Sequence, residues 1–338
     1  MLQQGSPAVK RHSMKTHAIR IHEFGGRDKL RWETVELPEP GAGEALIRHT
    51  AVGVNFIDTY HRSGLYPVPL PATLGMEAAG IIEAVGDHVT GLAPGDRVVY
   101  AGGSPGAYAE HRNFGAEQLV PIPDWMSDET AAAVFLKGLT SWYLLRRSYP
   151  VANGDPILLY AAAGGVGSIA SQWAKWLGAT VIGIVGTDRK ADLAKAHGCD
   201  HVILANAPDI PARVRELTSG KGVAAVYDSV GHDTFFTSLD CLRPHGVMVS
   251  FGNASGPVAP FAPAELARRG SLYVTRPILE PFVDTREKLL GAATEVFDFI
   301  RRGKPEIRIG QRYALQDTAK AHRDLEARKT TGSTLLMP

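Results

Sequence analysis

The sequence predicts an α/β fold in which a mostly β unit accompanies a doubly wound, six-stranded parallel sheet. The chain has 338 residues, of which 44% are hydrophobic, and this is enough for two domains that each bury a core. Short strands broken by Gly and Pro fill the first third of the chain. From Asp155 onward, strands alternate with helices.

The first unit runs from Lys15 to about Ala133, and turn sequences such as Pro94-Gly95-Asp96 separate its short apolar runs. The expected strands are residues 17–22, 45–54, 78–85 and 97–101. Strands at this spacing, without helices between them, are typical of a partly open β-barrel or a sandwich.

The alternating region has expected strands at residues 156–161, 180–185, 201–205, 224–228, 247–251 and 272–275. The expected helices are residues 166–177, 188–197, 210–218 and 234–242. In the first helix, Ile169, Trp173 and Leu177 share one face. Gly198 follows the second helix at the position where Gly commonly ends helices. Such alternation requires right-handed crossovers and a parallel sheet covered on both faces.

After Arg276 the alternation ends, and we expect helix 285–302, strand 307–313, helix 317–328 and strand 333–337. This tail is too small to fold alone, so we expect it to return to the first unit and complete its sheet. The predicted domains are residues 14–137 with 277–338, and residues 138–276. Residues 1–13 lack the apolar core of a secretory signal, and we interpret them as a disordered tail or as an upstream start preceding Met14.

The composition excludes several classes of protein. Lys and Arg total 36 against 35 Asp and Glu, and the net charge of +1 provides no basic field for nucleic acid. No stretch approaches the roughly 20 apolar residues of a membrane span, so a soluble protein is expected. The two cysteines, Cys199 and Cys241, are too few for a disulfide scaffold or a four-thiolate zinc site, and a cytoplasmic location is expected.

A glycine-rich loop, Ala-Ala-Ala-Gly-Gly-Val-Gly from Ala161 to Gly167, lies between the first strand and the first helix of the alternating region. Small residues at Ala162, Gly164 and Gly167 allow a tight turn, close approach of the backbone to a pyrophosphate, and close packing of helix on strand. The helix N-terminus adds free N–H groups and the positive end of its dipole. In this context the loop predicts dinucleotide binding rather than only a tight turn.

The end of the second strand favours NADPH over NADH. NAD sites usually place a carboxylate about 20 residues past the glycines, and this chain has Gly186 near that position. Glycine leaves room for a 2′-phosphate, and Arg189 and Lys190 follow closely to neutralise it. Asp188 is the counter-evidence, and we interpret it as the N-cap of the following helix.

The sequence also resembles a known family. Gly154-Asp155, Leu158, residues 162–165, Gly167, Gln172 and Lys175 fall at the spacings of the quinone oxidoreductase/ζ-crystallin signature. The match includes residues 55–60, 62–67, 136–140, 227–231, 249–253, 276–277 and 335–336. Over roughly residues 15–338 the chain resembles the zinc-free medium-chain dehydrogenases/reductases of the quinone oxidoreductase family, and most the bacterial NADPH:quinone oxidoreductases. The resemblance implies a GroES-like catalytic domain interrupted by a Rossmann domain, and commonly a homodimer.

The resemblance implies roles for individual residues. Asn55, Tyr60 and Tyr66 match the catalytic positions at the nicotinamide end. Lys137 and Thr140 lie at the domain junction and are expected to bind the cofactor, and for Lys137 the alternative is a structural ion pair. The remaining residues expected to bind the cofactor belong to the glycine-rich loop, the 2′-phosphate pocket and two strand ends: Gly165, Val166, Gly186, Thr187, Lys190, Arg328, Ser229, Phe251, Gly252 and Asn253, besides Asn55.

One position departs from the family pattern. Many relatives have a tyrosine near the adenosine phosphate, where this chain has Ala205. Because Lys190 and Arg328 remain, we expect the loss of that ring and hydroxyl to narrow the preference for NADPH over NADH without reversing it.

Zinc is not expected. Zinc alcohol dehydrogenases have a histidine before a glutamate at the position where this chain has Gly75-Met76-Glu77. The zinc-ligating cysteine expected near Asp58 is also missing. Four histidines lack ligand spacing and are interpreted as surface or packing residues: His49, His61, His88 and His111.

Without a metal, the acceptor must need little electrophilic help, and a quinone fits because its reduction restores an aromatic ring. We expect hydride transfer from nicotinamide C4 of NADPH to a small planar quinone. Tyr60 and Tyr66 are expected to offer flat faces to the acceptor and hydroxyls to its carbonyl, while Asn55 fixes the cofactor or donates a hydrogen bond. The alternative is that both tyrosines only pack within the β domain.

Two other functions stay open. A zinc-free reductase of α,β-unsaturated ketones or enoyl thioesters would share the fold, the cofactor and the hydride donor, and would differ only in the acceptor pocket. A non-catalytic NADPH-binding protein, structural or RNA-binding, is a different class. The even charge argues against RNA as the main partner.

Overall fold

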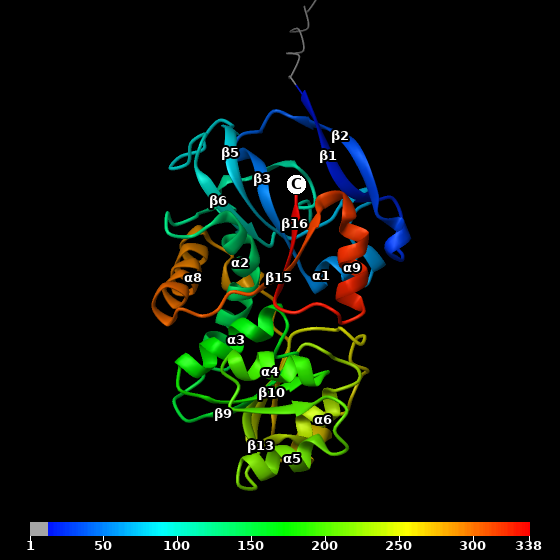
Figure 1. The fold of residues 1–338 in the computed structure, drawn as a ribbon, viewed down its shortest axis with the longest axis vertical. Helices are drawn as coiled ribbons and strands as arrows, with labels where there is room; N and C mark the ends of the chain where they lie inside the picture. Colours follow the sequence, from blue (N-terminus) through cyan, green and yellow to red (C-terminus); the bar gives the residue numbers. More distant parts are fainter. Residues whose placement is uncertain (1–12) are drawn as a thin grey trace, which may run out of the picture.

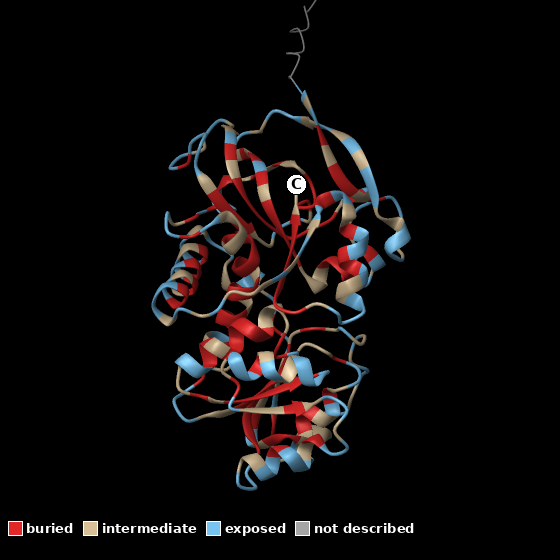
Figure 2. Cartoon of the chain, in the orientation of Figure 1, coloured by how far each residue is buried: buried red, intermediate tan, exposed pale blue. Residues whose placement is uncertain are grey.

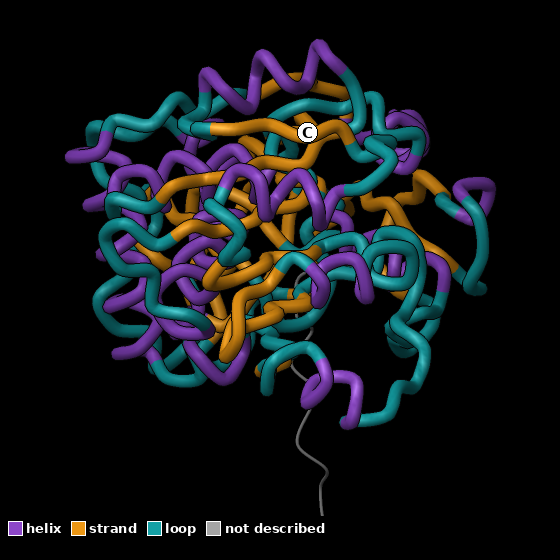
Figure 3. Tube along the Cα trace, turned by 90° about the horizontal axis from the view of Figure 1, so that it is seen from below, coloured by secondary structure: helices purple, strands orange, loops and turns teal. Residues whose placement is uncertain are grey.

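Two β-rich parts stacked end to end make up the computed structural model, which describes residues 13–338 (Figure 1). The part at the top of Figure 1 holds both ends of the described chain, and the other part is one sheet flanked by helices. Seen from below, the strands lie in the interior with helices around them (Figure 3). This architecture confirms the predicted fold class.

The first part contains two sheets. One has the order β2-β1-β4, and the other has the order β15-β16-β3-β5-β6-β8 with β7 paired to β3. Buried residues alternate with more exposed ones in β7 and in the first part of β3, whereas β5 and β16 contain continuous buried runs (Figure 2). The strands are β1 (Ser13–Ile21), β2 (Arg31–Pro38), β3 (Glu44–Val54), β4 (Ala72–Thr73), β5 (Glu77–Val85), β6 (Arg97–Ala101), β7 (His111–Gly115), β8 (Val120–Pro121), β15 (Ile309–Ala314) and β16 (Ser333–Met337).

The second part is a parallel sheet with the order β11-β10-β9-β12-β13-β14. Its strands are β9 (Pro156–Tyr160), β10 (Thr180–Val185), β11 (His201–Leu204), β12 (Val223–Asp228), β13 (Leu242–Ser250) and β14 (Tyr273–Thr275). Its helices are α3 (Gly165–Trp176), α4 (Asp188–Ala196), α5 (Ile210–Leu217), α6 (Phe235–Asp240) and α7 (Ala264–Arg268). The strand order reverses direction at β9, and ligands of such sheets bind at the carboxyl ends of strands beside that point.

Helix α2 (Asp128–Tyr143) joins the two parts, and the sequence analysis did not predict it. It contacts β3, β5 and β6 on one side, and α3 and α8 (Arg286–Asp298) on the other. Because its apolar residues face neighbours all round, the helix shows no single apolar stripe. The predicted boundary between residues 137 and 138 falls in the middle of this helix.

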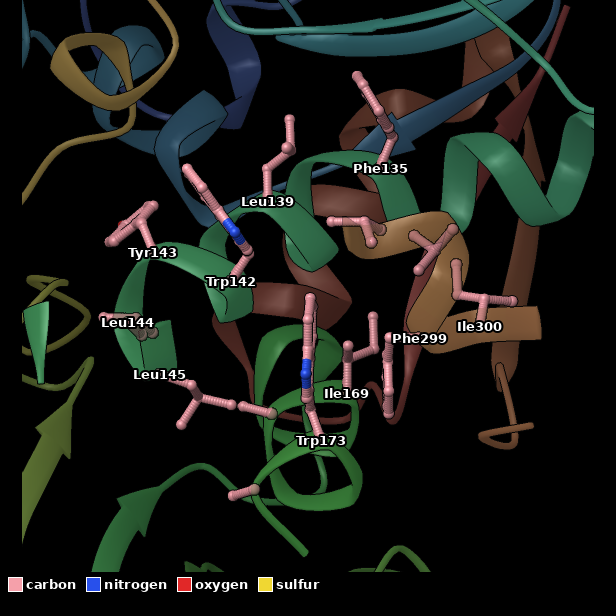
Figure 4. Close-up of a cluster of buried hydrophobic side chains, with 14 of the residues drawn as sticks. Phe135, Leu139, Trp142, Tyr143, Leu144, Leu145, Ile169, Trp173, Phe299 and Ile300 are labelled. Carbon is pink, nitrogen blue, oxygen red and sulfur yellow. The ribbon is translucent and has the colours of Figure 1, made fainter. Parts of the chain in front are cut away.

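Aromatic and aliphatic side chains fill the space between α2, α3 and the end of α8 (Figure 4). The Trp173 and Phe299 rings stack with centroids 4.5 Å apart. Phe299 begins a π-helical turn, Phe299–Gly303, that ends the predicted helix 285–302. This cluster ties the C-terminal segment to both parts of the molecule.

Helix α1 (Phe56–Ser63) was also missed, because its buried residues include Asp58, His61 and Arg62 and give no apolar period. The expectation of strands without intervening helices was therefore wrong in the first part. The tail does return as predicted, since β16 pairs antiparallel with β3.

Smaller differences concern element ends. Ser13, which was assigned to the tail, pairs with Pro38 as the first residue of β1, while residues 1–12 of that prediction lie outside the described residues. The expected helix 234–242 ends at Asp240, and Leu242 already belongs to β13. The last helix, α9 (Thr318–Glu326), stops two residues before Arg328. Because apolar periodicity does not mark terminal residues, such shifts are expected.

Candidate active site

The glycine-rich loop lies between β9 and α3. Gly164 is the N-cap of α3 and offers no side chain, so the N–H groups of Gly165 and Val166 have no intrahelical partner. A Cβ on Gly167 would lie 2.2 Å from the carbonyl oxygen of Ala161, so only glycine fits there. Apart from the bridge that Gly164 forms with Gly332, the first turn of α3 offers N–H groups and close packing that suit a pyrophosphate.

The C-terminal segment also reaches this loop. Gly332, just before β16, donates its N–H to the carbonyl oxygen of Ala163 at 3.1 Å. The contact brings the first part of the molecule against the predicted pyrophosphate site.

The end of β10 offers space and positive charge. A Cβ on Gly186 would meet no atom within 4 Å, so the space beside it is open. Lys190 Nζ donates to the backbone oxygen of Arg328 at 2.7 Å and joins the two parts. Burial lowers the pKa of Lys190, and the charges of Arg328 and Arg189 lower it further. A bound anion relieves such crowding of cations, so these residues fit a 2′-phosphate.

Asp188 is not the N-cap of α4, contrary to the sequence interpretation. Thr187 is the cap, and its side-chain oxygen accepts the N–H of Lys190 at 3.4 Å. Asp188 is the first helical residue, where a carboxylate favours the helix dipole. Both residue types cap helices, so the sequence alone placed the cap one residue too late.

A buried carboxylate organises the residues between β3 and α2. Glu77 is fully buried, and its Oε2 accepts from Asn55 Nδ2 at 3.0 Å and from Lys137 Nζ at 2.8 Å. Its Oε1 accepts the N–H of Leu136 at 2.6 Å. A Cβ on Gly53 would lie 2.2 Å from Glu77 Oε2, so glycine is required beside the carboxylate. Glu77 thus holds Asn55 and Lys137 in one place.

Lys137 forms the ion pair that was one of its two expected roles, and its contact with a cofactor stays a prediction. Its ammonium pairs with Glu77. Both side chains are buried, with exposed fractions of 5% for Lys137 and 0% for Glu77. Its aliphatic stem lies against the glycine-rich loop, since a Cβ on Gly165 would be 3.0 Å from Lys137 Cδ. The ion pair therefore borders the surface that a dinucleotide would occupy.

Two tyrosines from the first part meet one asparagine from the second. The N–H of Asn253 donates to Tyr60 Oη at 2.9 Å, and its Nδ2 donates to Tyr66 Oη at 3.0 Å. The tyrosine rings are edge to face, with centroids 5.2 Å apart. Arg276 Nη2 also donates to Tyr66 Oη, at 3.0 Å. Burial raises the pKa of Tyr60, which keeps its hydroxyl protonated.

For the other predicted residues, the structure shows contacts within their own helix or between neighbouring loops. Thr140 Oγ1 donates to Leu136 O at 2.7 Å within α2, so this hydroxyl is used by its own helix. Phe251 donates its N–H to Asp228 O at 2.8 Å. A Cβ on Gly252 would lie 2.4 Å from Ser229 O, so the loops after β12 and β13 touch there.

Sequence reasoning missed Glu77 and Arg276 as members of the site. A charged residue within the apolar stretch of β5 was the available signal for Glu77. For Arg276 the available signals were the family match at residues 276–277 and its place directly after the last strand of the parallel sheet.

A buried polar chain behind α1 was also missed. Tyr108 Oη donates to Asp58 Oδ2 at 2.7 Å and bonds with His322 Nε2 at 3.0 Å, while Arg62 Nη1 bonds with His322 Nδ1 at 3.0 Å. Asp58 Oδ2 also accepts the N–H of Asn55 at 2.8 Å. Because Asp58 contacts Asn55 directly, these hydrogen-bonded side chains fix the start of α1, which carries Asn55 and Tyr60.

The metal question concerns the Gly75-Met76-Glu77 segment. Glu77 is occupied by its three donors, and Met76 offers only a thioether. Within residues 13–338, no group of three or more His, Cys, Asp and Glu side chains could hold a metal ion. Over the same residues, no helix is long and apolar enough to cross a membrane.

Known proteins are similar to this chain in sequence and in fold. A family model for the alcohol dehydrogenase GroES-like domain matches residues 41–124, and one described as zinc-binding dehydrogenase matches residues 165–285. The chain is 52% identical to a quinone oxidoreductase of Pseudomonas aeruginosa over 321 residues, which cover 95% of this chain and 99% of the relative. The chain belongs to the medium-chain dehydrogenase/reductase family, among the quinone oxidoreductases.

Two further members are informative. A structure of Escherichia coli quinone oxidoreductase complexed with NADPH has a TM-score of 0.93 and 48% identity, covering 95% of this chain and 100% of that one. A 2-haloacrylate reductase from a Burkholderia species is 43% identical over 95% of this chain and 98% of its own length. Medium-chain reductases of this kind are oxidoreductases, so the prediction of an enzyme is confirmed.

Proposed function

We propose that the protein reduces quinones with NADPH, by hydride transfer that needs no zinc. One observation carries the proposal most directly. The hydroxyl oxygens of Tyr60 and Tyr66 both accept hydrogen bonds, and neither hydroxyl donates one to any residue within 13–338. Two phenolic protons are therefore available at the junction of the two parts, where a quinone carbonyl could accept them.

The cofactor would be held by residues of both parts. Gly164 to Gly167 would take the pyrophosphate, and Lys190 with Arg328 would take the 2′-phosphate, beside the open space at Gly186. NADPH, when bound, supplies the hydride from nicotinamide C4. Binding of NADPH by a 48% identical relative supports this choice of cofactor.

The tyrosines would act on the acceptor. A quinone oxygen gains negative charge when the quinone accepts the hydride. Hydrogen bonds from pre-positioned donors stabilise that charge. Asn253 fixes both phenols, because its backbone N–H and side-chain amide bind one each. The hydroquinone anion then takes its proton from water, and no separate acid is required.

Zinc independence rests on the residues themselves. Met76 stands where a zinc enzyme needs an imidazole, and Glu77 is neutralised by Lys137 at 2.8 Å. One of the matching families is described as zinc-binding, but these side chains do not supply ligands for zinc.

A second candidate is reduction of a carbon–carbon double bond conjugated to a carbonyl group. The 43% identity to a 2-haloacrylate reductase favours it, since an acrylate is such a substrate. The same tyrosine donors would serve the enolate that forms.

The test compares oxidation of NADPH with a small 1,4-naphthoquinone, with a simple enone and with a 2-haloacrylate, each with and without a chelator. Chelator-insensitive turnover of the quinone supports the proposal. Turnover of the alkenes alone moves the function to alkene reduction. Tight NADPH binding without any turnover leaves a non-catalytic role.

The proposed assembly is a homodimer. Strand β14 is an outer strand of the parallel sheet, and nearby Tyr273 and Ile278 are 61% and 57% exposed. Pairing of β14 with the same strand of a second copy would cover these side chains. Light scattering should give twice the chain mass, and Tyr273→Lys should shift it toward the monomer. A monomeric wild-type mass at micromolar concentration would refute the assembly.

A further inference from the structure

Arg276 brings a positive charge to the proposed acceptor site. It directly follows β14, and its Nη2 donates to Tyr66 Oη at 3.0 Å. Its Nη1 makes only a long contact with Pro277 O, at 3.5 Å. The guanidinium therefore shares a hydroxyl with Asn253, whose Nδ2 binds the same Tyr66 oxygen.

The charge of Arg276 has no acidic partner among the described residues. None of the ion pairs within residues 13–338 includes it. The buried carboxylate of the site, Glu77, is neutralised by Lys137. Among residues 13–338, Arg276 therefore adds an unpaired positive charge to the acceptor end.

The electrostatic effect of Arg276 reaches two elements. Burial raises the pKa of Tyr60 on α1, and the charge of Arg276 opposes that rise. The same holds for Tyr143 on α2, whose pKa burial raises to about 12. Arg276 is itself exposed, and its bond to Tyr66 Oη places it at the junction of the two parts.

From this arrangement we infer that Arg276 determines specificity for acceptors that carry a carboxylate or sulfonate beside the reducible group. A guanidinium with one weakly held N–H edge can bind such an oxyanion through two parallel hydrogen bonds. Tyr66 Oη, already bonded to Arg276, would then lie next to the acceptor's carbonyl. The inference rests on the proposed function of Tyr60 and Tyr66 as donors to the acceptor.

The experiment compares 1,4-naphthoquinone with 1,4-naphthoquinone-2-sulfonate in the wild type, Arg276→Gln and Arg276→Lys. The two quinones differ in intrinsic reactivity, so the quantity measured is the ratio of their kcat/KM values in each protein. Arg276→Gln should lower this ratio, sulfonate over neutral, by about tenfold or more. Arg276→Lys should keep most of it, because the charge remains. Raising the ionic strength should reduce the wild-type ratio.

A matched control is Arg268→Gln, which removes an exposed arginine paired with Glu265. It should leave the ratio unchanged. Equal losses for both quinones in Arg276→Gln would mean that Arg276 only positions Tyr66, and would overturn the inference. An unchanged ratio would overturn it as well.

A binding measurement separates this inference from the proposed function. Calorimetry with 2-naphthalenesulfonate, which cannot be reduced, is run on enzyme saturated with NADP⁺. If the wild type turns over neither quinone, but binds the sulfonate at least tenfold more tightly than Arg276→Gln does, the proposed function fails and the anion site stands. Equal affinities of the wild type and Arg276→Gln for the sulfonate would refute the anion site, whatever the turnover shows.

Discussion

The backbone N–H of Asn253, in the loop after β13, donates to Tyr60 Oη, in α1, at 2.9 Å. These residues are 193 positions apart in the sequence and come from the two different parts of the molecule. The bond occupies a lone pair of the phenol and leaves its proton free. The proposed chemistry depends on this contact and on the parallel one to Tyr66.

Removing either hydroxyl should impair turnover more than stability. Tyr60→Phe and Tyr66→Phe should each lower kcat for the quinone by about tenfold, since each removes one of two donors to the developing charge. Steady-state kinetics and thermal melting test this. Tyr313→Phe is the control, because it removes a hydroxyl bonded to Asp324 instead. If the tyrosines only pack, their variants will lose stability and keep kcat.

Lys190 should discriminate between the two nicotinamide cofactors. Lys190→Ala should lower kcat/KM for NADPH by about 10- to 100-fold through loss of a phosphate contact, and leave that for NADH nearly unchanged. Lys195→Ala, on the same helix and exposed, is the control. A wild-type enzyme that prefers NADH would contradict the assignment of the 2′-phosphate pocket, and would show that Ala205 has reversed the preference.

Removing the charge of only one partner of the buried Glu77–Lys137 pair should strongly lower the free energy of unfolding. Glu77→Gln leaves the Lys137 ammonium buried without its counter-charge, and we expect a loss of about 3–5 kcal/mol in the free energy of unfolding. Adding Lys137→Met to Glu77→Gln should recover much of it, since no buried charge remains. Urea unfolding measures both variants. If Glu77→Gln alone is as stable as the wild type, Lys137 is hydrated rather than paired.

Asp58 should make stability depend on pH. Burial raises its pKa from 3.8 to about 7, against the hydrogen bond from Tyr108. Between these values the folded carboxyl keeps a proton that the unfolded chain has lost, so its contribution to stability falls as pH rises from about 4 to about 7 and is constant above. His322 has the opposite effect, because burial lowers its pKa to about 3 and its contribution grows with pH up to its ordinary value.

The Asp58→Asn variant isolates the carboxyl. Its free energy of unfolding relative to the wild type should rise by up to about 4 kcal/mol between about pH 4 and pH 8. Urea unfolding at both ends of this range is the measurement, with the exposed Asp124→Asn as control. A difference that does not change with pH would mean that Asp58 is ionised in the folded protein across the range.

Sequence patterns predicted some levels of this structure well. Strand 180–185 and strand 333–337 were placed to the residue, because apolar runs bounded by turn residues mark buried strands. Helices α1 and α2 were missed because their buried residues are polar or surround the helix, and then no apolar stripe exists.

In the site, too, some features could be predicted from the sequence and others could not. The tight turn of the glycine-rich loop could be predicted, because it lies in one short segment, while its role and that of Gly186 in binding a cofactor stay predictions. The bonds of Glu77 to Lys137 and of Arg276 to Tyr66 join segments 60 and 210 residues apart. Such contacts depend on how the chain folds, and one sequence without its structure does not contain them.

The most direct test of the account measures NADPH oxidation with 1,4-naphthoquinone, in the presence of a chelator, by the wild type and by the double variant Tyr60→Phe with Tyr66→Phe. We expect the wild type to oxidise NADPH as fast with the chelator as without it. For the double variant we expect a loss of about 100-fold in turnover, with unchanged affinity for NADPH. Loss of wild-type activity on chelation, or full activity of the double variant, would contradict the proposed function.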